Sequence, residues 1–148
     1  MCSVGPAGLA ARSGGVAVPL VRLPAEVTSA AAARRFVREA FTTLPGIGPD
    51  VARSVIEDAA LVASELVTNA ILHGGRSVKL AVRVVDGDEL EISVADDLQA
   101  WPERRAPDPD RPGGVGLVIV ESVGASWGTE QLVGGKAVWC RLRLRDTR

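Results

Sequence analysis

The stretch "SELVTNAILHGG", residues 64–75, carries three polar side chains at steps of four in an otherwise apolar segment. At about 100° per residue, Glu65, Asn69 and His73 fall within an arc of about 80° on an α-helix. The neighbouring arc, which would face the core, holds Ala59, Val62, Ala63, Leu66, Val67 and Ala70. The polar line therefore follows the edge of the buried face, where side chains would border a cleft.

Each of these polar residues also has an ordinary explanation. A helix boundary is commonly polar and partly exposed, and this reading is as good as a functional one for any single residue. Asn69 fits it least, because an asparagine amide competes with the backbone and lowers helix propensity. His73 stands directly before Gly74 and Gly75, so capping the helix end is an equally good role for it.

Two helices and a first strand are predicted before residue 75. The segment 16–23 reads as a strand, and Pro19 favours an edge position because its nitrogen carries no hydrogen. The first helix is predicted to begin after Ser29 as N-cap and to end before "PGIGP". The second helix is predicted from near Pro49 to His73.

Three later strands are predicted by alternation at 77–85, 89–96 and 136–145, the first two forming a hairpin that turns around Gly87. A short apolar helix is predicted at 115–125. One face of the strands is apolar and the other polar, which is typical of an antiparallel sheet covered by helices on one side. The apolar face would be made of Val78, Leu80, Val82, Val84, Leu90, Ile92, Val94, Val138, Cys140, Leu142 and Leu144.

The composition limits the classes of function. A chain of 148 residues fits one domain that buries roughly 70% of its unfolded surface. Its two cysteines, Cys2 and Cys140, are too few and too far apart for a disulfide framework or a zinc site, which favours a reducing cytoplasm. We find no signal peptide and no apolar run near the ~20 residues of a membrane span.

The charge balance argues against direct nucleic-acid or membrane binding. Seventeen basic against eighteen acidic residues give a formal net charge of -1, so the chain has no general basic footprint. Arg141, Arg143 and Arg145 alternate along the last strand and form a basic strip. A solvated sheet surface explains that strip more simply.

Two further segments carry the signs of a ligand site. "RPGGVGLVIV", residues 111–120, places three glycines before a helix, where backbone N–H groups can cradle a phosphate. A flexible entry into a helix explains the glycines equally well. "ISVADD" ends a strand with Asp96, which is either a turn residue or a carboxylate that accepts a hydrogen bond from an exocyclic amino group such as that of adenine. The long loop 97–112 between them is of a length that is usually functional.

The order of "ELVTNAILH", "VADD", a long loop and "GGVGL" resembles the GHKL ATP-binding superfamily. The resemblance covers about residues 16–145, with 1–15 left as a flexible N-terminus. It implies a Bergerat fold, an α+β two-layer sandwich whose mixed, mostly antiparallel sheet has helices on one face. Within the superfamily, a stand-alone domain of this length resembles the anti-sigma-factor serine kinases and their actinobacterial relatives.

The resemblance assigns roles to residues of this sequence. Asn69 would hold Mg²⁺ and Glu65 would be the general base, with His73 beside the nucleotide and Asp96 on the adenine amino group. The loop 97–112 would be the ATP lid. Phosphate contacts would come from the lid and the glycine turn, namely from Arg104, Arg105, Arg111, Gly113, Gly114, Val115, Gly116 and Leu117.

The sequence departs from the superfamily at three positions. Leu98 and Ala100 stand where relatives commonly carry glycine, and Ala137 stands where they often carry threonine. The added Cβ atoms would hinder the approach of the backbone to the nucleotide, and Ala137 removes a polar support.

Two hypotheses follow from the resemblance and these departures. The first is an Mg-ATP-dependent regulatory serine/threonine kinase that phosphorylates a serine of an antagonist protein and binds a sigma factor in the cytoplasm. The second is a catalytically weak or inactive partner-switching module that acts by protein contact. Homodimers are common among such kinases, and the first strand and helix would be the place of contact.

Overall fold

The computed structural model describes residues 19–48, 50–73, 76–96, 122–123 and 126–145. Alternating apolar residues give strands, and the segments with helical periodicity give two long helices. In chain order the elements are β1 (Leu20–Pro24), α1 (Ser29–Thr43), α2 (Arg53–Leu72), β2 (Ser77–Val85), β3 (Glu89–Asp96), β4 (Ser126–Leu132) and β5 (Gly135–Arg143).

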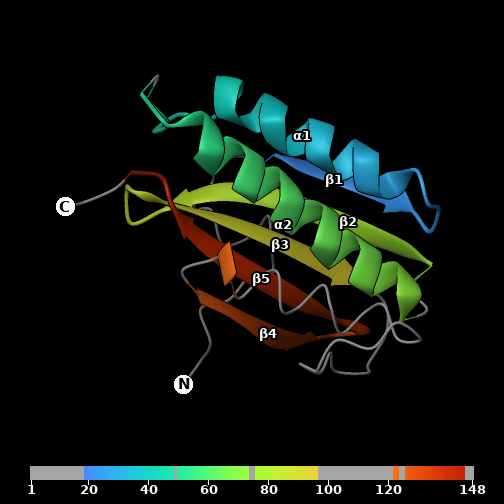
Figure 1. The fold of residues 1–148 in the computed structure, drawn as a ribbon. Helices are drawn as coiled ribbons and strands as arrows, with labels where there is room; N and C mark the ends of the chain where they lie inside the picture. The colour runs from blue at the N-terminus through green and yellow to red at the C-terminus, as the bar shows by residue number, and fades with distance from the viewer. Residues whose placement is uncertain (1–18, 49, 74–75, 97–121, 124–125, 146–148) are drawn as a thin grey trace.

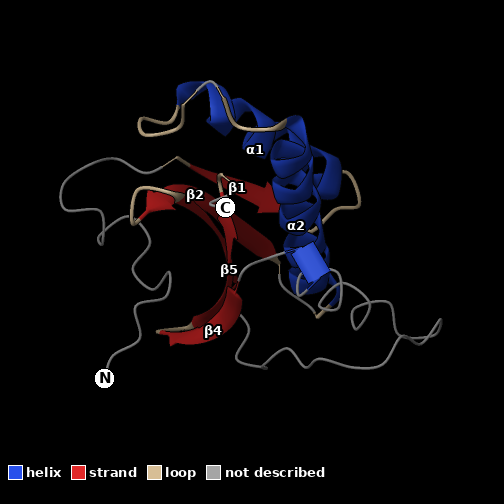
Figure 2. Cartoon of the chain, turned by 60° about the vertical axis from the view of Figure 1, so that its left-hand side comes forward, coloured by secondary structure: helices blue, strands red, loops and turns tan. Residues whose placement is uncertain are grey.

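The strands form one sheet in the order β1-β2-β3-β5-β4, and every pair of neighbours is antiparallel. Both helices lie on the same face of this curved sheet (Figures 1 and 2). The predicted α+β two-layer architecture is therefore confirmed. β1 is at one edge, as Pro19 indicated, and Pro19 O accepts a hydrogen bond from Val82 N at 3.2 Å.

The core lies between the helices and the apolar face of the sheet. Strand register aligns its side chains in rows across three strands, so that Val82 faces Ile92 and Ile92 faces Cys140. These three side chains have no exposed surface. Every residue predicted for the apolar face belongs to this core or packs against it, because a period of two places alternate side chains on one face.

The β2–β3 hairpin is predicted correctly to the residue. Its turn contains Asp86 with φ 53° and Gly87 with φ 82°, the left-handed backbone region that glycine adopts without cost and aspartate tolerates. The "DGD" sequence is thus the local reason for the hairpin.

The first helix begins one residue before its predicted position. Thr28 is the N-cap and makes no capping hydrogen bond through its side chain, so Ser29 is already helical. The Ser29 hydroxyl instead donates to Pro24 O at 2.6 Å. Ser29 therefore ties the start of α1 to the end of β1 and does not act as a cap.

The second helix begins later than predicted, at Arg53 instead of near Pro49. Ala52 is extended, with ψ 145°, and Ile47 and Val51 before it pack against the core. With these two side chains packed against the core, the segment before residue 53 is not helical. The helix ends at Leu72 with His73 as its C-cap.

The boundaries of the outer strands differ slightly from expectation. β1 runs to Pro24 and β5 ends at Arg143 instead of 145. Leu144 leaves the ladder with β3 and donates its N–H to Asp88 O at 2.8 Å. Of the helix predicted at 115–125 the structure describes only Ser122 and Val123, which are helical.

Strand β4 was not predicted. Its sequence, "SWGTEQL", has neither apolar alternation nor a β-branched run, and it lies at the second edge of the sheet. Gly128 faces Trp139 across the ladder, and a Cβ built at Gly128 would lie 2.6 Å from Trp139 Cζ2. The indole of Trp139 fills the space that the glycine leaves.

The face of the sheet away from the helices is polar but not simply solvated. Glu91 on β3 is 1% exposed and lies opposite Arg83 and Arg141 in the ladder. Arg83 Nε donates to its Oε1 at 2.8 Å, and Arg141 Nε donates to its Oε2 at 3.0 Å. The Arg141 guanidinium also stacks 5.0 Å from the Trp139 ring centroid. Arg141, which belongs to the predicted basic strip, therefore forms an ion pair with Glu91 within the sheet.

Candidate functional site

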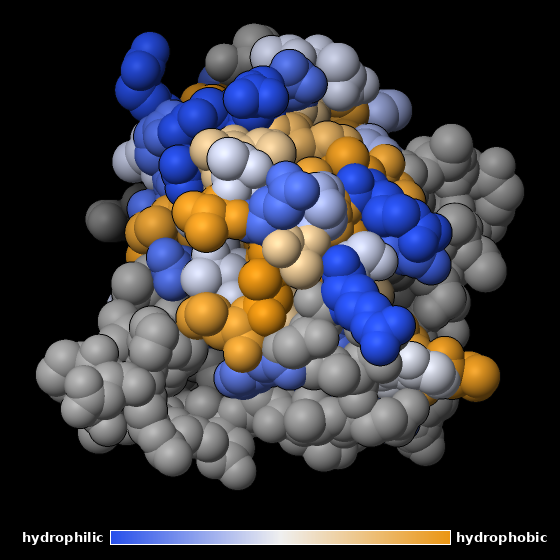
Figure 3. Space-filling model, turned by 90° about the vertical axis from the view of Figure 1, so that its right-hand side faces the viewer, coloured by the Kyte–Doolittle hydropathy of each residue, from blue (hydrophilic) through white to orange (hydrophobic). Residues whose placement is uncertain are grey.

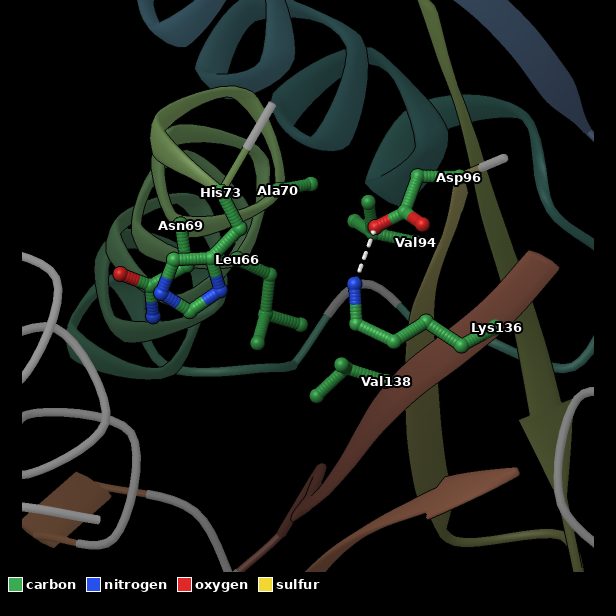
Figure 4. Close-up of a pocket in the computed structure, with 8 residues that line it drawn as sticks. All are labelled: Leu66, Asn69, Ala70, His73, Val94, Asp96, Lys136 and Val138. Carbon is green, nitrogen blue, oxygen red and sulfur yellow. Dashed lines mark hydrogen bonds and ion pairs between the residues drawn. The ribbon is translucent and has the colours of Figure 1, made fainter. Parts of the chain in front are cut away.

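One pocket lies where the last turns of α2 meet the ends of β3 and β5. Figure 4 shows Asn69 and His73 on the helix side and Asp96 and Lys136 on the strand side. The walls between them are apolar, which suits a flat aromatic ring. The complete lining is Leu66, Asn69, Ala70, His73, Val94, Asp96, Lys136 and Val138.

Three of the residues predicted from the sequence are thus brought together from distant parts of the chain. Asn69 and His73 come from α2 because they lie one turn apart on the edge of its buried face, and Asp96 comes from the last position of β3. Asp96 faces the helices because Val94, two residues earlier, does so as well. The side of the molecule at which α2 ends shows apolar and hydrophilic surface interspersed (Figure 3).

A buried ion pair forms the polar end of the pocket. Lys136 Nζ donates to Asp96 Oδ2 at 2.8 Å, and both side chains are 2% exposed. The two residues are direct neighbours in the β3–β5 ladder. A buried pair of this kind is costly to break, because the remaining charge is left without a partner in a medium of low polarity.

The interpretation of Ala137 as a lost polar support is corrected by this register. Ala137 pairs with Ala95 and is completely buried, and neither residue lines the pocket. The side chain that reaches the pocket from this part of β5 is that of Lys136, one residue earlier. Lys136 is not among the site residues predicted from the sequence, although it is one of only two lysines in the chain and is the first residue of the strand predicted at 136–145.

Asn69 is the polar side chain on the helix side with an unused donor. The residue is 6% exposed, and its Nδ2 is buried without a hydrogen-bond partner among the residues that the structure describes. Buried amides are normally satisfied, so this amide fits a group that enters the pocket. Its Oδ1 is the type of oxygen ligand that Mg²⁺ takes together with phosphate oxygens and water.

His73 closes the helix. Its backbone N–H donates to Asn69 O at 3.0 Å, and its side chain is exposed at the rim of the pocket. The geometry therefore agrees with the capping role and also leaves the imidazole beside the opening.

Glu65 lies one turn before Asn69 on α2 and is not among the residues that line the pocket. It is half-buried, and desolvation raises the pKa of its carboxyl above the ordinary value, while the charge of Arg34 on α1 opposes that rise. A raised pKa brings a carboxyl closer to the range in which it can exchange protons near neutral pH. Its role as a general base remains a prediction.

The remaining predicted site residues lie outside the described part of the chain. They are Arg104, Arg105, Arg111, Gly113, Gly114, Val115, Gly116 and Leu117, together with the substituted positions Leu98 and Ala100. The lid predicted at 97–112 and the domain limits at 16 and 145 likewise remain predictions.

The lining of the pocket offers groups that can bind an adenine ring, but the cavity is smaller than the ring. Apolar walls, a carboxylate and a buried amide are the groups that such a ligand requires. The cavity, however, measures only about 10 Å³, room for about one water molecule. A base could therefore enter only if side chains of the lining shift.

Comparisons with known proteins agree with this geometry. Residues 23–139 match the family described as the histidine kinase-like ATPase domain. A search of curated proteins found no match.

Two solved structures are similar in fold. The first contains the RsbU and RsbW domains of Rv1364c from Mycobacterium tuberculosis, with 24% identity and a TM-score of 0.61 over 90% of this chain and 35% of that one. The chain thus spans about a third of the length of that structure. The second is the SiaB–SiaC complex from Pseudomonas aeruginosa, with 12% identity and a TM-score of 0.50 over 84% of this chain and 88% of that one.

At these identities the structural likeness establishes the fold, whereas the match to residues 23–139 covers most of the chain. The helix that carries Asn69, the strand end at Asp96 and the position of Lys136 on β5 all fall inside this match. The chain is therefore a member of the histidine kinase-like ATPase domain family.

Proposed function

We propose that this chain binds Mg-ATP in the pocket between α2 and the ends of β3 and β5, and that it acts as a regulatory serine/threonine kinase. The observation that carries the proposal is the pocket itself, which combines apolar walls with the buried Asp96 carboxylate and the Asn69 amide. Family membership supports ATP as the ligand.

The proposal assigns a role to two residues of the pocket and to three glycines of the sequence. Asp96 would accept a hydrogen bond from the exocyclic amino group, and Asn69 Oδ1 would hold Mg²⁺ at the phosphates. The metal supplies charge that offsets the negative phosphate oxygens. The glycines 113, 114 and 116 would contact those oxygens through backbone N–H groups.

Glu65 would act on the protein substrate. Its carboxylate would accept the proton of a serine hydroxyl as the serine oxygen bonds to the terminal phosphorus and the bond to the leaving ADP oxygen breaks. The products are phosphoserine and ADP, and the proton remains on Glu65 until it passes to solvent. The raised pKa of this carboxyl favours uptake of that proton.

The partners follow from the resemblance of the sequence to the anti-sigma-factor serine kinases. We propose an antagonist protein as the substrate and a sigma factor as the alternative partner. Of the two structures similar in fold, one has RsbU and RsbW domains and the other is a complex of SiaB with SiaC. Homodimerisation through β1 and α1 belongs to the same proposal, as does a cytoplasmic location. Among the described residues, no helix is long and apolar enough to cross a membrane.

Calorimetric titration of the wild type and Asn69→Ala with ATP, in the presence and absence of Mg²⁺, tests the binding part. We expect Mg²⁺ to strengthen ATP binding by the wild type and to have little effect on Asn69→Ala. Ser64→Ala, at a buried position earlier on α2 and outside the pocket lining, is the control. Equal Mg²⁺ dependence in both proteins would remove Asn69 from the metal site.

A second function is favoured by the position of Glu65. Because Glu65 does not line the pocket, the chain is also a candidate for a nucleotide-dependent partner switch without phosphoryl transfer. Incubation of a serine-bearing antagonist with labelled ATP and Mg²⁺ separates the two. Labelled phosphoserine supports the kinase, whereas ATP-dependent complex formation without labelling supports the switch.

A further inference from the structure

Lys136 has hydrogen-bonding capacity that the described residues do not use. An ammonium carries three N–H donors and no acceptor. Within the described part of the chain, Lys136 Nζ makes one hydrogen bond, to Asp96 Oδ2, although its side chain is only 2% exposed. A buried donor without an acceptor costs free energy, so this ammonium is poised for a ligand that supplies acceptors.

The location of Nζ restricts what that ligand can be. Lys136 extends from β5 along the strand side of the pocket, and its ammonium lies near the wall made by Val94 and Val138 (Figure 4). A group that enters between this wall and Leu66 on α2 meets the ammonium and the carboxylate side by side. It must be apolar on its two faces and polar along one edge.

The ion pair also determines how such a group binds. Displacing Lys136 from Asp96 would leave a buried charge without a partner, which is strongly unfavourable. A ligand that joins the pair avoids this cost. It needs a hydrogen-bond donor for the carboxylate and, directly beside it, an acceptor for the ammonium.

We propose that Lys136 and Asp96 together read the edge of the adenine base. Asp96 accepts a hydrogen bond from the exocyclic amino group, and Lys136 donates one to the adjacent ring nitrogen, N1. This inference rests on the proposed binding of ATP and adds a binding residue and a specificity rule to it. Under this rule, a nucleotide that keeps the amino group but lacks the N1 acceptor binds weakly.

The test compares ATP with 1-deaza-ATP, in which a C–H replaces N1 while the amino group stays in place. Titration calorimetry of the full chain with Mg²⁺ gives both dissociation constants. For the wild type we expect 1-deaza-ATP to bind about tenfold more weakly or worse, the usual effect of losing one hydrogen bond to a charged group. Lys136→Met should bind the two nucleotides equally.

Lys79→Met is the matched control. Lys79 is the only other lysine of the chain, and it is exposed on β2 outside the pocket. This variant should keep the full preference for ATP. The wild-type comparison needs no variant and therefore decides the question even if Lys136→Met does not fold.

Three results would overturn the inference. Equal binding of the two nucleotides by the wild type would leave ATP binding intact but remove Lys136 from base recognition. Tighter ATP binding by Lys136→Met would show that Lys136 obstructs the pocket. Failure of the wild type to bind either nucleotide would overturn the proposed function together with the inference.

Discussion

Asp96 and Glu91 are buried carboxylates on opposite faces of β3, and they are paired in different ways. Glu91 is held by two arginines, one on each of its oxygens, and these arginines are 25% and 20% exposed. Asp96 is paired with Lys136, whose side chain is as buried as its own. The arginines can direct their remaining N–H groups to water, whereas the lysine cannot.

The difference separates a structural ion pair from one suited to binding. On the outer face, the ion pairs connect β2, β3 and β5 directly across the ladder. Because these arginines are partly exposed, their desolvation penalty is small. In the pocket, the Lys136 ammonium retains donors that no described residue accepts, next to apolar walls. Buried polar groups are normally satisfied by hydrogen bonds, so one that keeps unfilled capacity is a candidate for contact with a ligand.

Removal of the pocket carboxylate should have the largest effect. Asp96→Ala leaves the Lys136 ammonium buried without a partner, and we expect a loss of about 3–5 kcal/mol in the free energy of unfolding. Urea denaturation followed by circular dichroism measures it. The double variant Asp96→Asn/Lys136→Met removes both charges and should recover most of the loss; a cost under about 1 kcal/mol for Asp96→Ala would contradict the buried pairing.

Removal of the outer carboxylate should cost less. Glu91→Ala abolishes two charge-assisted hydrogen bonds, but Arg83 and Arg141 can turn toward water, so we expect a loss of about 2 kcal/mol. The same urea titration provides the value. Glu89→Ala is the control, since Glu89 lies on the same face of β3 and makes no ion pair among the described residues. If Glu91→Ala lost more stability than Asp96→Ala, the expected order of the two ion pairs would be reversed.

Glu65 offers a third carboxylate whose stability contribution depends on pH. Its pKa is raised by burial in the folded state, so its contribution is present below the unfolded-state pKa and is lost as pH rises through the folded-state pKa. We expect the stability of the wild type to fall as pH rises above about 4.3, and we expect Glu65→Gln not to show this part of the fall. Unfolding titrations at a series of pH values measure the slope.

Glu57 provides a control of opposite sign. Its hydrogen bond with Arg38 lowers the pKa of the Glu57 carboxyl, so its contribution is present above the unfolded-state pKa and is lost as pH falls through the lowered value. Glu57→Gln should therefore reduce the loss of stability on acidification. The same direction of change in both variants would be inconsistent with these assignments.

The smallest effect is expected at Cys140, on the helix side of β5. Burial raises the pKa of its thiol to about 12, so almost none of it is thiolate near neutral pH. In a Cys2→Ser background, iodoacetamide should leave the folded protein almost unlabelled by mass spectrometry at pH 8 and should label it in urea. Rapid labelling of the folded chain would mean that the helix side of the sheet is open to reagents.

The sequence predicted those elements whose side-chain periodicity is strong. β2 and β3 were predicted to the residue because alternation and the Asp86-Gly87 turn specify the same hairpin. β4 was missed because its residues do not alternate in hydropathy and it pairs along only one edge. The pocket residues on α2 and at the end of β3 were identified from their position at the margin of an apolar face.

Lys136 shows what single-sequence reasoning does not reach. Alternation places position 136 on the same face of β5 as Val138 and Cys140, but only the register between β3 and β5 pairs Lys136 with Asp96. A different register would bring another residue opposite Asp96. Likewise, the alternating Arg83 and Arg141 indicate a polar face, but only the ladder places Glu91 between them.

The pairing of Asp96 with Lys136 also bears on how the chain folds. These two residues are 40 positions apart, whereas the β2–β3 hairpin closes over a three-residue turn. Contacts between distant residues require an unfavourable loop closure and tend to form after local ones. We therefore expect the hairpin to be structured early and the pocket late, so that substitutions at Asp96 accelerate unfolding more than they slow folding.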